Sequence, residues 1–343
     1  MTGFLRSLRA ELFGLLHRRS TLVALILVFV ASFLGLAVGW LEHNVLRPSE
    51  EGYNAHLNFW PRFGQAAHAG FWLVEILTLV MVGGLLAREI QHGAARDPVT
   101  RRISRSAFVA SRAVAAMLFP LLLTGWNLAI SWGGSALLFE KGHIVTDPVV
   151  VFEDPEAEKG FQVWLQENQF RADDIAAWRD LVQSGEEEAD AARQLGLEPF
   201  SMPPEYDSYI PNLVFYQDEV AGDLNRAILA ALPSLLTLSL FAFCVSVLVP
   251  SVVVAAGAAL GIVLVLGRFM APEMGEHATW LFADWLPALG HESQLAKARQ
   301  IAEGYSDVAA TEEAWISRGY WATLFEAVAL SVLAWGVFRR RAL

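Results

Sequence analysis

Six long apolar segments constrain this chain more than any other feature of its sequence. Each holds roughly the 20 apolar residues that an α-helix needs to cross the ~30 Å hydrocarbon layer of a bilayer. They cover residues 21–41, 69–87, 113–139, 227–249, 251–268 and 320–338. Because backbone polar groups cannot be left unsatisfied in lipid, segments of this kind fold as helices. The sequence therefore predicts an all-α polytopic membrane protein with six transmembrane helices.

The composition agrees with this class. Hydrophobic residues make up 55% of the chain and charged residues only 18%, which is unlike a soluble globular domain. The single cysteine, Cys244, excludes an intrachain disulfide. A leader of about 20 residues precedes the first apolar segment, and that segment is too long for the core of a cleaved signal peptide. We therefore expect the first segment to be a membrane span.

Arginines predict the orientation of the chain in the membrane. Thirteen of the 25 basic residues fall before the first span, between the second and third spans, or after the sixth. They are Arg6, Arg9, Arg18, Arg19, Arg88, Arg96, Arg101, Arg102, Arg105, Arg112, Arg339, Arg340 and Arg341. The positive-inside rule assigns that side to the cytoplasm, so both termini are expected inside. Arginine-rich, lysine-poor usage points to a bacterium, and hence to the bacterial cytoplasmic (inner) membrane.

Residues 1–20 form a separate amphipathic unit. Phe4, Leu8, Leu12 and Leu16 recur every fourth residue, with polar residues on the other faces. This spacing predicts a helix that lies in the membrane interface before the first span. Its role is either a simple anchor or an additional contact with a cytoplasmic subunit.

Residues 140–225 predict an external, mainly helical acidic lobe between spans three and four. Residues 140–223 hold twenty acidic and five basic residues, a net charge of about −15. Helices are expected at 160–170, 173–182 and 186–195, with a small apolar core. The expected core residues are Phe161, Trp164, Leu165, Trp178 and Leu181. The acidity is explained either by a solvated surface or by contact with an extracytoplasmic partner protein or a cationic cargo.

The second half of the chain, residues 226–343, carries spans four to six and another external segment at 271–318. That segment begins with an apolar stretch that includes Trp280, Leu281, Phe282, Trp285 and Leu286. The stretch is too short to cross a bilayer, so we expect it to re-enter the outer leaflet and leave on the same side.

The loop at 88–112, within the unit 21–139 that holds spans one to three, is basic and helix-forming. The stretch 87–112 contains six arginines and no lysine, and it is longer than a simple connector needs to be. On the cytoplasmic side such a loop predicts a docking surface for a soluble partner. Topology and anionic-lipid contact are the alternative explanation for its arginines.

This arrangement resembles the permease subunits of ABC-2 type transporters, in particular permeases grouped with copper-enzyme maturation systems. That family has a glutamate, a Gly-Thr pair, and then Pro-Val-Ser-Arg followed by Gly-Lys in the same loop. Here the likeness is carried by Glu89, Gly93, Ile103, Ser104 and Arg105. The departures are Ala94 for threonine, Arg102 for proline, and Ser111-Arg112 for Gly-Lys.

The resemblance implies a subunit of an exporter that works with other chains. Cytoplasmic ABC ATPases would carry the ATP and Mg²⁺, since this chain has no GxxxxGK[ST] loop and is not expected to be an enzyme. A second permease, identical or different, would complete the membrane part, in contact with membrane lipids and with no nucleic acid. In this scheme Arg101, Arg102 and Arg105 pair with acidic residues of an ATPase.

Three charges inside the spans are further site candidates. They are Glu75, Arg268 and Glu326. Charges within a bilayer are costly and face a bundle interior or water, so we expect Arg268 to pair with Glu75 or Glu326. The group is either a structural ion pair or part of a translocation path.

The histidines do not indicate a metal site, and two classes of function other than an exporter remain open. His43, His56 and His68 are too widely spaced for a compact metal motif and are expected to be structural or solvated. An ABC-type complex that transmits force or signal to an external partner is one alternative to an exporter. A stand-alone channel or carrier is the other, and it predicts charges along a pore midplane.

Overall fold

The computed structural model describes residues 2–41, 58–91, 104–145, 149–150, 155–183, 185–206, 209–210, 214–291, 293–303 and 313–340. Most of these residues are helical, and six helices are long and apolar enough to cross a membrane. They cover Arg19–Leu41, Phe59–Gln91, Arg105–Leu138, Gln217–Leu248, Val252–Met274 and Ile316–Arg340. The prediction of a multi-pass helical membrane protein is confirmed.

Some spans are single helices, and others consist of one long helix continued by a short one. The first four helices of the chain are α1 (Thr2–His17), α2 (Arg19–Leu41), α3 (Phe59–Gly83) and α4 (Leu85–Gln91), of which α4 continues the span of α3. Then come α6 (Arg105–Leu138), α10 (Gln217–Leu248), α11 (Val252–Leu264), the π-helix η3 (Val265–Met270), α12 (Ala271–Met274) and α14 (Glu313–Arg340).

Several helices begin well before the apolar segments that mark them. Asn58 caps α3 by accepting a 3.1 Å hydrogen bond from the Trp60 backbone N–H, so the helix starts before residue 69. Ser104 caps α6 in the same way through Ala107 N–H, at 3.2 Å. A helix of 34 residues such as α6 is about 50 Å long, more than the ~30 Å hydrocarbon layer. These helices therefore carry polar turns beyond the membrane.

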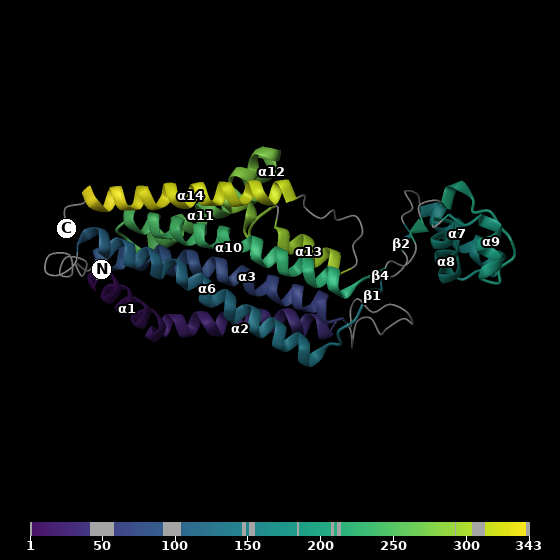
Figure 1. The fold of residues 1–343 in the computed structure, drawn as a ribbon, viewed down its shortest axis with the longest axis horizontal. Coiled ribbons are helices and arrows are strands. Elements are labelled where there is room, and N and C mark those ends of the chain that lie inside the picture. The colour runs from purple at the N-terminus through teal and green to yellow at the C-terminus, as the bar shows by residue number, and fades with distance from the viewer. Residues whose placement is uncertain are drawn as a thin grey trace.

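The bundle has a buried centre and two exposed edges. In its most apolar stretch α10 is 67% buried, against 22% for α14 and 28% for α2. In Figure 1, α14 and α2 run along opposite edges, with α3, α6 and α10 between them. The side chains that point outward from α2 and α14 are large and apolar, which suits contact with lipid.

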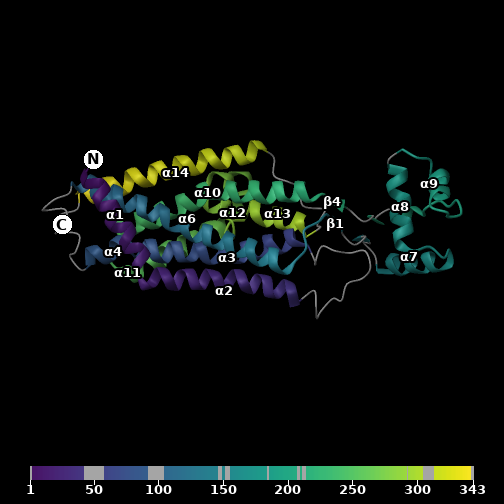
Figure 2. The same ribbon diagram turned by 60° about the horizontal axis from the view of Figure 1, so that its bottom comes forward.

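The two ends of the bundle differ. Both chain termini, the end of α4 and the start of α6 lie at one end, which we call the terminal end (Figures 1 and 2). The opposite end, which we call the lobe end, lies toward a separate unit of three short helices. An even number of spans places both termini together, as expected.

A buried polar contact joins α2, α3 and α6. The Asn127 amide donates to the Ala67 carbonyl at 2.9 Å and accepts from the Ser32 hydroxyl at 2.8 Å. Gly70 on α3 leaves room for this asparagine, because an added Cβ would overlap its side-chain oxygen. The three helices can therefore approach closely where small residues face one another.

The lobe consists of α7 (Pro155–Glu167), α8 (Ala172–Gln183), α9 (Glu188–Gln194) and the 3-10 helix η2 (Pro204–Tyr206). The three helices match the predicted ones within a few residues. Of the predicted core, Phe161, Leu165 and Trp178 are buried, and Trp164 and Leu181 pack beside them.

Two short antiparallel strand pairs lie in the connections between lobe and bundle. Strands β1 (Ile144–Val145) and β4 (Val214–Phe215) form one pair, and β2 (Val149–Val150) and β3 (Tyr209–Ile210) form the other. They bring the two connections side by side. The lobe is thus linked to the bundle through a narrow paired stem.

The chain folds back into the bundle between α12 and α14. The 3-10 helices η4 (Gly275–Trp280) and η5 (Phe282–Trp285) lead into a turn, and α13 (Gln294–Ala302) follows. Residues 282–290 are all buried, and we call them the buried segment. The short helices α12, η4 and η5 that lead into and form this part of the chain are too short to cross a bilayer, as predicted for the start of 271–318.

Candidate functional site

An ion-pair cluster at the terminal end joins three helices. The Arg112 guanidinium on α6 lies 2.8 Å from a Glu11 carboxylate oxygen on α1 and 2.8 Å from a Glu89 oxygen on α4. A second nitrogen of Arg112 donates to the other Glu89 oxygen at 3.2 Å. Arg112 is only 6% exposed, so the pairs are largely shielded from water. We call Glu11, Glu89 and Arg112 the arginine cluster.

Neighbouring contacts hold the arginine cluster in place. Arg112 lies over the ring of Phe108, one turn earlier on α6, with 3.6 Å between the guanidinium carbon and the ring centroid. The hydroxyls of Ser7 and Ser111 are 2.8 Å apart and add a further link between α1 and α6. Burial raises the pKa of the Glu11 carboxyl, and the nearby Arg112 charge opposes this shift. Removing one member would leave a buried charge without its partner.

The start of α6 also contacts the end of the chain. Arg105 donates from its guanidinium to the Arg339 carbonyl of α14 at 3.3 Å. The rings of Phe108 and Phe338 stack with 5.6 Å between centroids. The start of α6, which follows the 92–103 connection, therefore contacts α1, α4 and α14.

The residues that were predicted to couple the 88–112 loop to an ATPase divide into two groups. Glu89, Ser104 and Arg105 belong to the described part of the chain and take the places given above. Gly93, Arg101, Arg102 and Ile103 lie outside the described residues. Glu89 pairs with Arg112 of the same chain, a role that the sequence did not predict for either residue.

Glu75 on α3 holds the buried segment by its backbone. The two carboxylate oxygens accept hydrogen bonds from the N–H groups of Ala288 at 2.7 Å and Leu289 at 2.8 Å. The residue is fully buried, at 0% exposure. It lies about 24 Å along α3 from Phe59, about two-thirds of the way along the helix. A segment without regular hydrogen bonding thus finds its acceptors in a carboxyl group on a neighbouring span.

Glu326 and Arg268 contact the same segment from other helices. Glu326 on α14 accepts from the Phe282 N–H at 2.8 Å. Arg268 in the π-helix donates to the Ala288 carbonyl at 3.1 Å. Among the described residues, no ion pair within 4.0 Å joins Arg268 to either carboxylate, although the Arg268 charge acts on Glu75. The backbone N–H groups of the buried segment take both carboxylates instead.

Hydroxyl and indole groups complete the attachment of the buried segment. Ser234 on α10 donates to the Trp285 carbonyl at 3.0 Å, and Ser293 donates to the Pro287 carbonyl at 2.6 Å. The indole N–H of Trp285 donates to the Thr279 carbonyl at 2.9 Å. These contacts could not be predicted, because single serines and threonines are common in apolar helices and do not indicate which group they contact.

In the described part of the chain, no three His, Cys, Asp or Glu side chains gather where they could hold a metal ion. His68 lies on α3, whereas His43 and His56 fall outside the described residues. The arginine cluster and the contacts of the buried segment both consist of charges that join separate helices. No family model matches this chain, and no curated protein sequence matches it.

Proposed function

We propose that this chain is the transmembrane permease subunit of an ABC-2 type exporter, coupled to ATPase subunits on other chains. The observation that carries the proposal is the arginine cluster. It links the helix before the 92–103 connection to the helix after it, and both to α1. A partner that moved this connection would act on several helices together.

The proposed orientation places the terminal end in the cytoplasm of a bacterium and the lobe outside its inner membrane. Helix α1 would lie in the cytoplasmic interface, as its alternating apolar and polar faces favour. The buried segment would then re-enter from the outside. Two such permeases, identical or different, would pair across the membrane, with an ATPase below each.

The coupling step follows from the contacts. ATP-driven closure of the ATPases would shift the 92–103 connection, and Arg112 and Arg105 would pass the shift to α1, α4, α6 and α14. Buried ion pairs resist being pulled apart, because separation leaves a charge unpaired at a cost of about 3–5 kcal/mol. The cluster would therefore move as a unit instead of yielding at one contact.

Co-purification tests this proposal. The tagged chain is co-expressed with its neighbouring genes, extracted in mild detergent and assayed for a bound ATPase and its activity. We expect an ATPase to be recovered, and Arg101→Glu with Arg102→Glu to release it. The matched control is Arg171→Glu with Arg193→Glu, two exposed arginines of the lobe. A folded chain that is recovered without any ATPase, or equal loss in both double variants, would contradict the proposal.

The lobe favours a second candidate, a complex that transmits force to an external protein without moving a solute. The lobe has its own apolar cores, and in the described part of the chain two short strand pairs lie between it and the bundle. A photo-crosslinker at Val163, 52% exposed on α7, would then capture one defined external protein that stimulates ATP hydrolysis. The same group at Phe325, 76% exposed on α14, is the control. Solute uptake by sealed vesicles without any such protein would exclude this candidate.

A further inference from the structure

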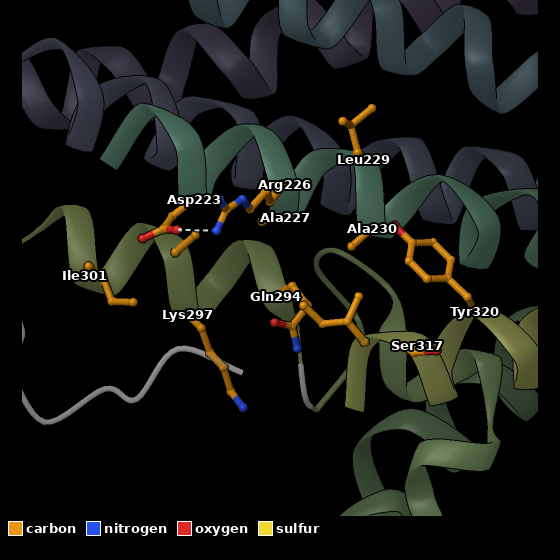
Figure 3. Close-up of a pocket in the computed structure, with 12 residues that line it drawn as sticks. Asp223, Arg226, Ala227, Leu229, Ala230, Gln294, Lys297, Ile301, Ser317 and Tyr320 are labelled. Carbon is orange, nitrogen blue, oxygen red and sulfur yellow. Dashed lines mark ion pairs between the residues drawn. The ribbon is translucent and has the colours of Figure 1, made fainter. Parts of the chain in front are cut away.

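A cleft of about 440 Å³ opens at the lobe end between α10, α13 and α14. Figure 3 shows the side chains that line it. They are Asp223, Arg226, Ala227, Leu229, Ala230, Gln294, Lys297, Ala298, Ile301, Ile316, Ser317 and Tyr320. Its volume falls within the 300–1,000 Å³ of small-molecule sites. The cleft is separate from the arginine cluster and from the contacts of Glu75.

Each wall of the cleft is one face of a helix. On α10 and on α13 the lining residues follow the i, i+3, i+4, i+7 spacing that places side chains on one face. On α10 the charged members come first, and the apolar members Ala227 and Ala230 follow; on α13, Lys297 comes after Gln294 and is followed by apolar residues. On α14, Ile316 and Tyr320 continue the apolar wall. The cleft thus combines charged groups with an apolar surface.

The cleft lies where the apolar spans begin. Arg226 directly precedes the apolar part of α10, and Ile316 begins the apolar stretch of α14. Tyr320 and Trp321 are 40% and 66% exposed beside it. Aromatic rings with polar groups are enriched at the level of lipid headgroups. Both helices therefore place this cleft at the boundary between headgroups and acyl chains.

The charges of the cleft favour an anion. Arg226 and Lys297 stand on the α10 and α13 walls, and Asp223 is the one acidic residue among the lining residues that the structure describes. Arg226 lies 4.0 Å from Asp223, at the limit of an ion pair, and its side chain is 80% exposed (Figure 3). A weak exposed pair leaves most guanidinium donors available to a phosphate, which guanidinium binds through paired hydrogen bonds.

We propose that this cleft binds an anionic phospholipid of the surrounding leaflet. The phosphate binds the exposed Arg226 guanidinium, with Lys297 as a further positive charge on the α13 wall, and one acyl chain follows the apolar wall past Ala230 toward Tyr320. Basic pockets between transmembrane helices recognise anionic headgroups in this way. The assignment depends on the cleft and on the membrane level alone, so it stands whether or not an ATPase partner exists.

The bound lipid would also touch the region of the buried segment. A small adjoining cavity shares Ala230, Ile316 and Tyr320 with the cleft and is closed on its other side by Trp285. Trp285 belongs to the buried segment and accepts the Ser234 hydrogen bond from α10. An acyl chain in the cleft would therefore pack against the wall that holds this segment in place.

Lipid titration by native mass spectrometry tests the proposal. Phosphatidylglycerol, phosphatidylcholine or inorganic phosphate is added to the purified full chain in a nonionic detergent. We expect phosphatidylglycerol to bind more tightly than phosphatidylcholine, and Arg226→Gln with Lys297→Gln to weaken it about 30-fold, because each cation near a headgroup contributes roughly fivefold. The matched control removes two exposed charges of the lobe, Lys159→Gln with Arg193→Gln, and should bind as the native chain does.

A second variant tests the same site by a gain of affinity. Asp223→Asn removes the acidic neighbour of Arg226, so phosphatidylglycerol should bind several-fold more tightly. This result decides the question if the double variant fails to fold. Three results would each overturn the proposal: equal binding of both phospholipids, competition by phosphate at the lipid's own concentration, or a double variant that binds as well as its control.

Discussion

The attachment of the buried segment to Glu75 leads to a sharp prediction. Both carboxylate oxygens accept a backbone N–H, from Ala288 and from Leu289. In Glu75→Gln one oxygen becomes an NH2 group, which faces the second N–H as donor against donor. A buried N–H without an acceptor costs about 1–3 kcal/mol. The substitution should therefore destabilise the protein by about that amount.

Glu326→Gln is the matched control. Glu326 accepts only one N–H, from Phe282, and the amide oxygen of glutamine can accept the same bond. The change should lower stability by about 1 kcal/mol or less, the difference between a charged and a neutral acceptor. Both variants remove one carboxylate from a span, so their difference isolates the second N–H bond at position 75.

Two measurements check this prediction. Thermal unfolding in detergent, followed by tryptophan fluorescence, should show a Tm lower by roughly 1–4 °C for Glu75→Gln and a smaller change for Glu326→Gln. Hydrogen exchange at Ala288 and Leu289 should accelerate about 5- to 150-fold in Glu75→Gln. Equal effects of the two variants, or unchanged exchange at these two amides, would refute the reasoning.

Two further predictions concern helix packing. Gly70→Ala should destabilise the bundle by about 1–3 kcal/mol, because the added methyl group overlaps the buried asparagine of α6, whereas Gly125→Ala meets no atom within 4 Å and should be neutral or slightly stabilising. Arg112→Met should cost up to about 3 kcal/mol by leaving two partly buried carboxylates unpaired, and adding Glu11→Gln and Glu89→Gln should recover part of this loss. Chemical denaturation in mixed micelles measures all four variants. Equal stability of the two alanine variants, or no recovery in the triple variant, would contradict the respective argument.

Local patterns predicted the elements well. The six spans, the amphipathic α1 and the three helices of the lobe depend on each segment's own hydropathy and periodicity. Their starts were less predictable. Helix α3 begins at Phe59 and α6 at Arg105 because Asn58 and Ser104 cap them, and a cap can be recognised only when the helix that it begins is known.

Partners across the bundle were not predictable in the same way. The sequence singled out Glu75, Arg268 and Glu326 because charges are rare in apolar spans, and all three do contact one segment. Their direct contacts are with backbone groups of that segment, whereas the expectation of an ion pair used opposite charge alone. It could not include the backbone donors of a segment that lies 213 residues from Glu75.

Hydropathy and helical spacing are properties of neighbouring residues. The sequence by itself therefore determined the six spans, and with an even number of spans it also placed the two chain termini at the same end of the bundle. Two sets of contacts depend on which helices pack together. They are the ion pairs of Arg112 with Glu11 and Glu89, and the hydrogen bonds that Glu75 accepts from two backbone N–H groups. Only the tertiary structure decides this, because a buried charge pairs with whichever donor or acceptor the packing brings within about 3 Å.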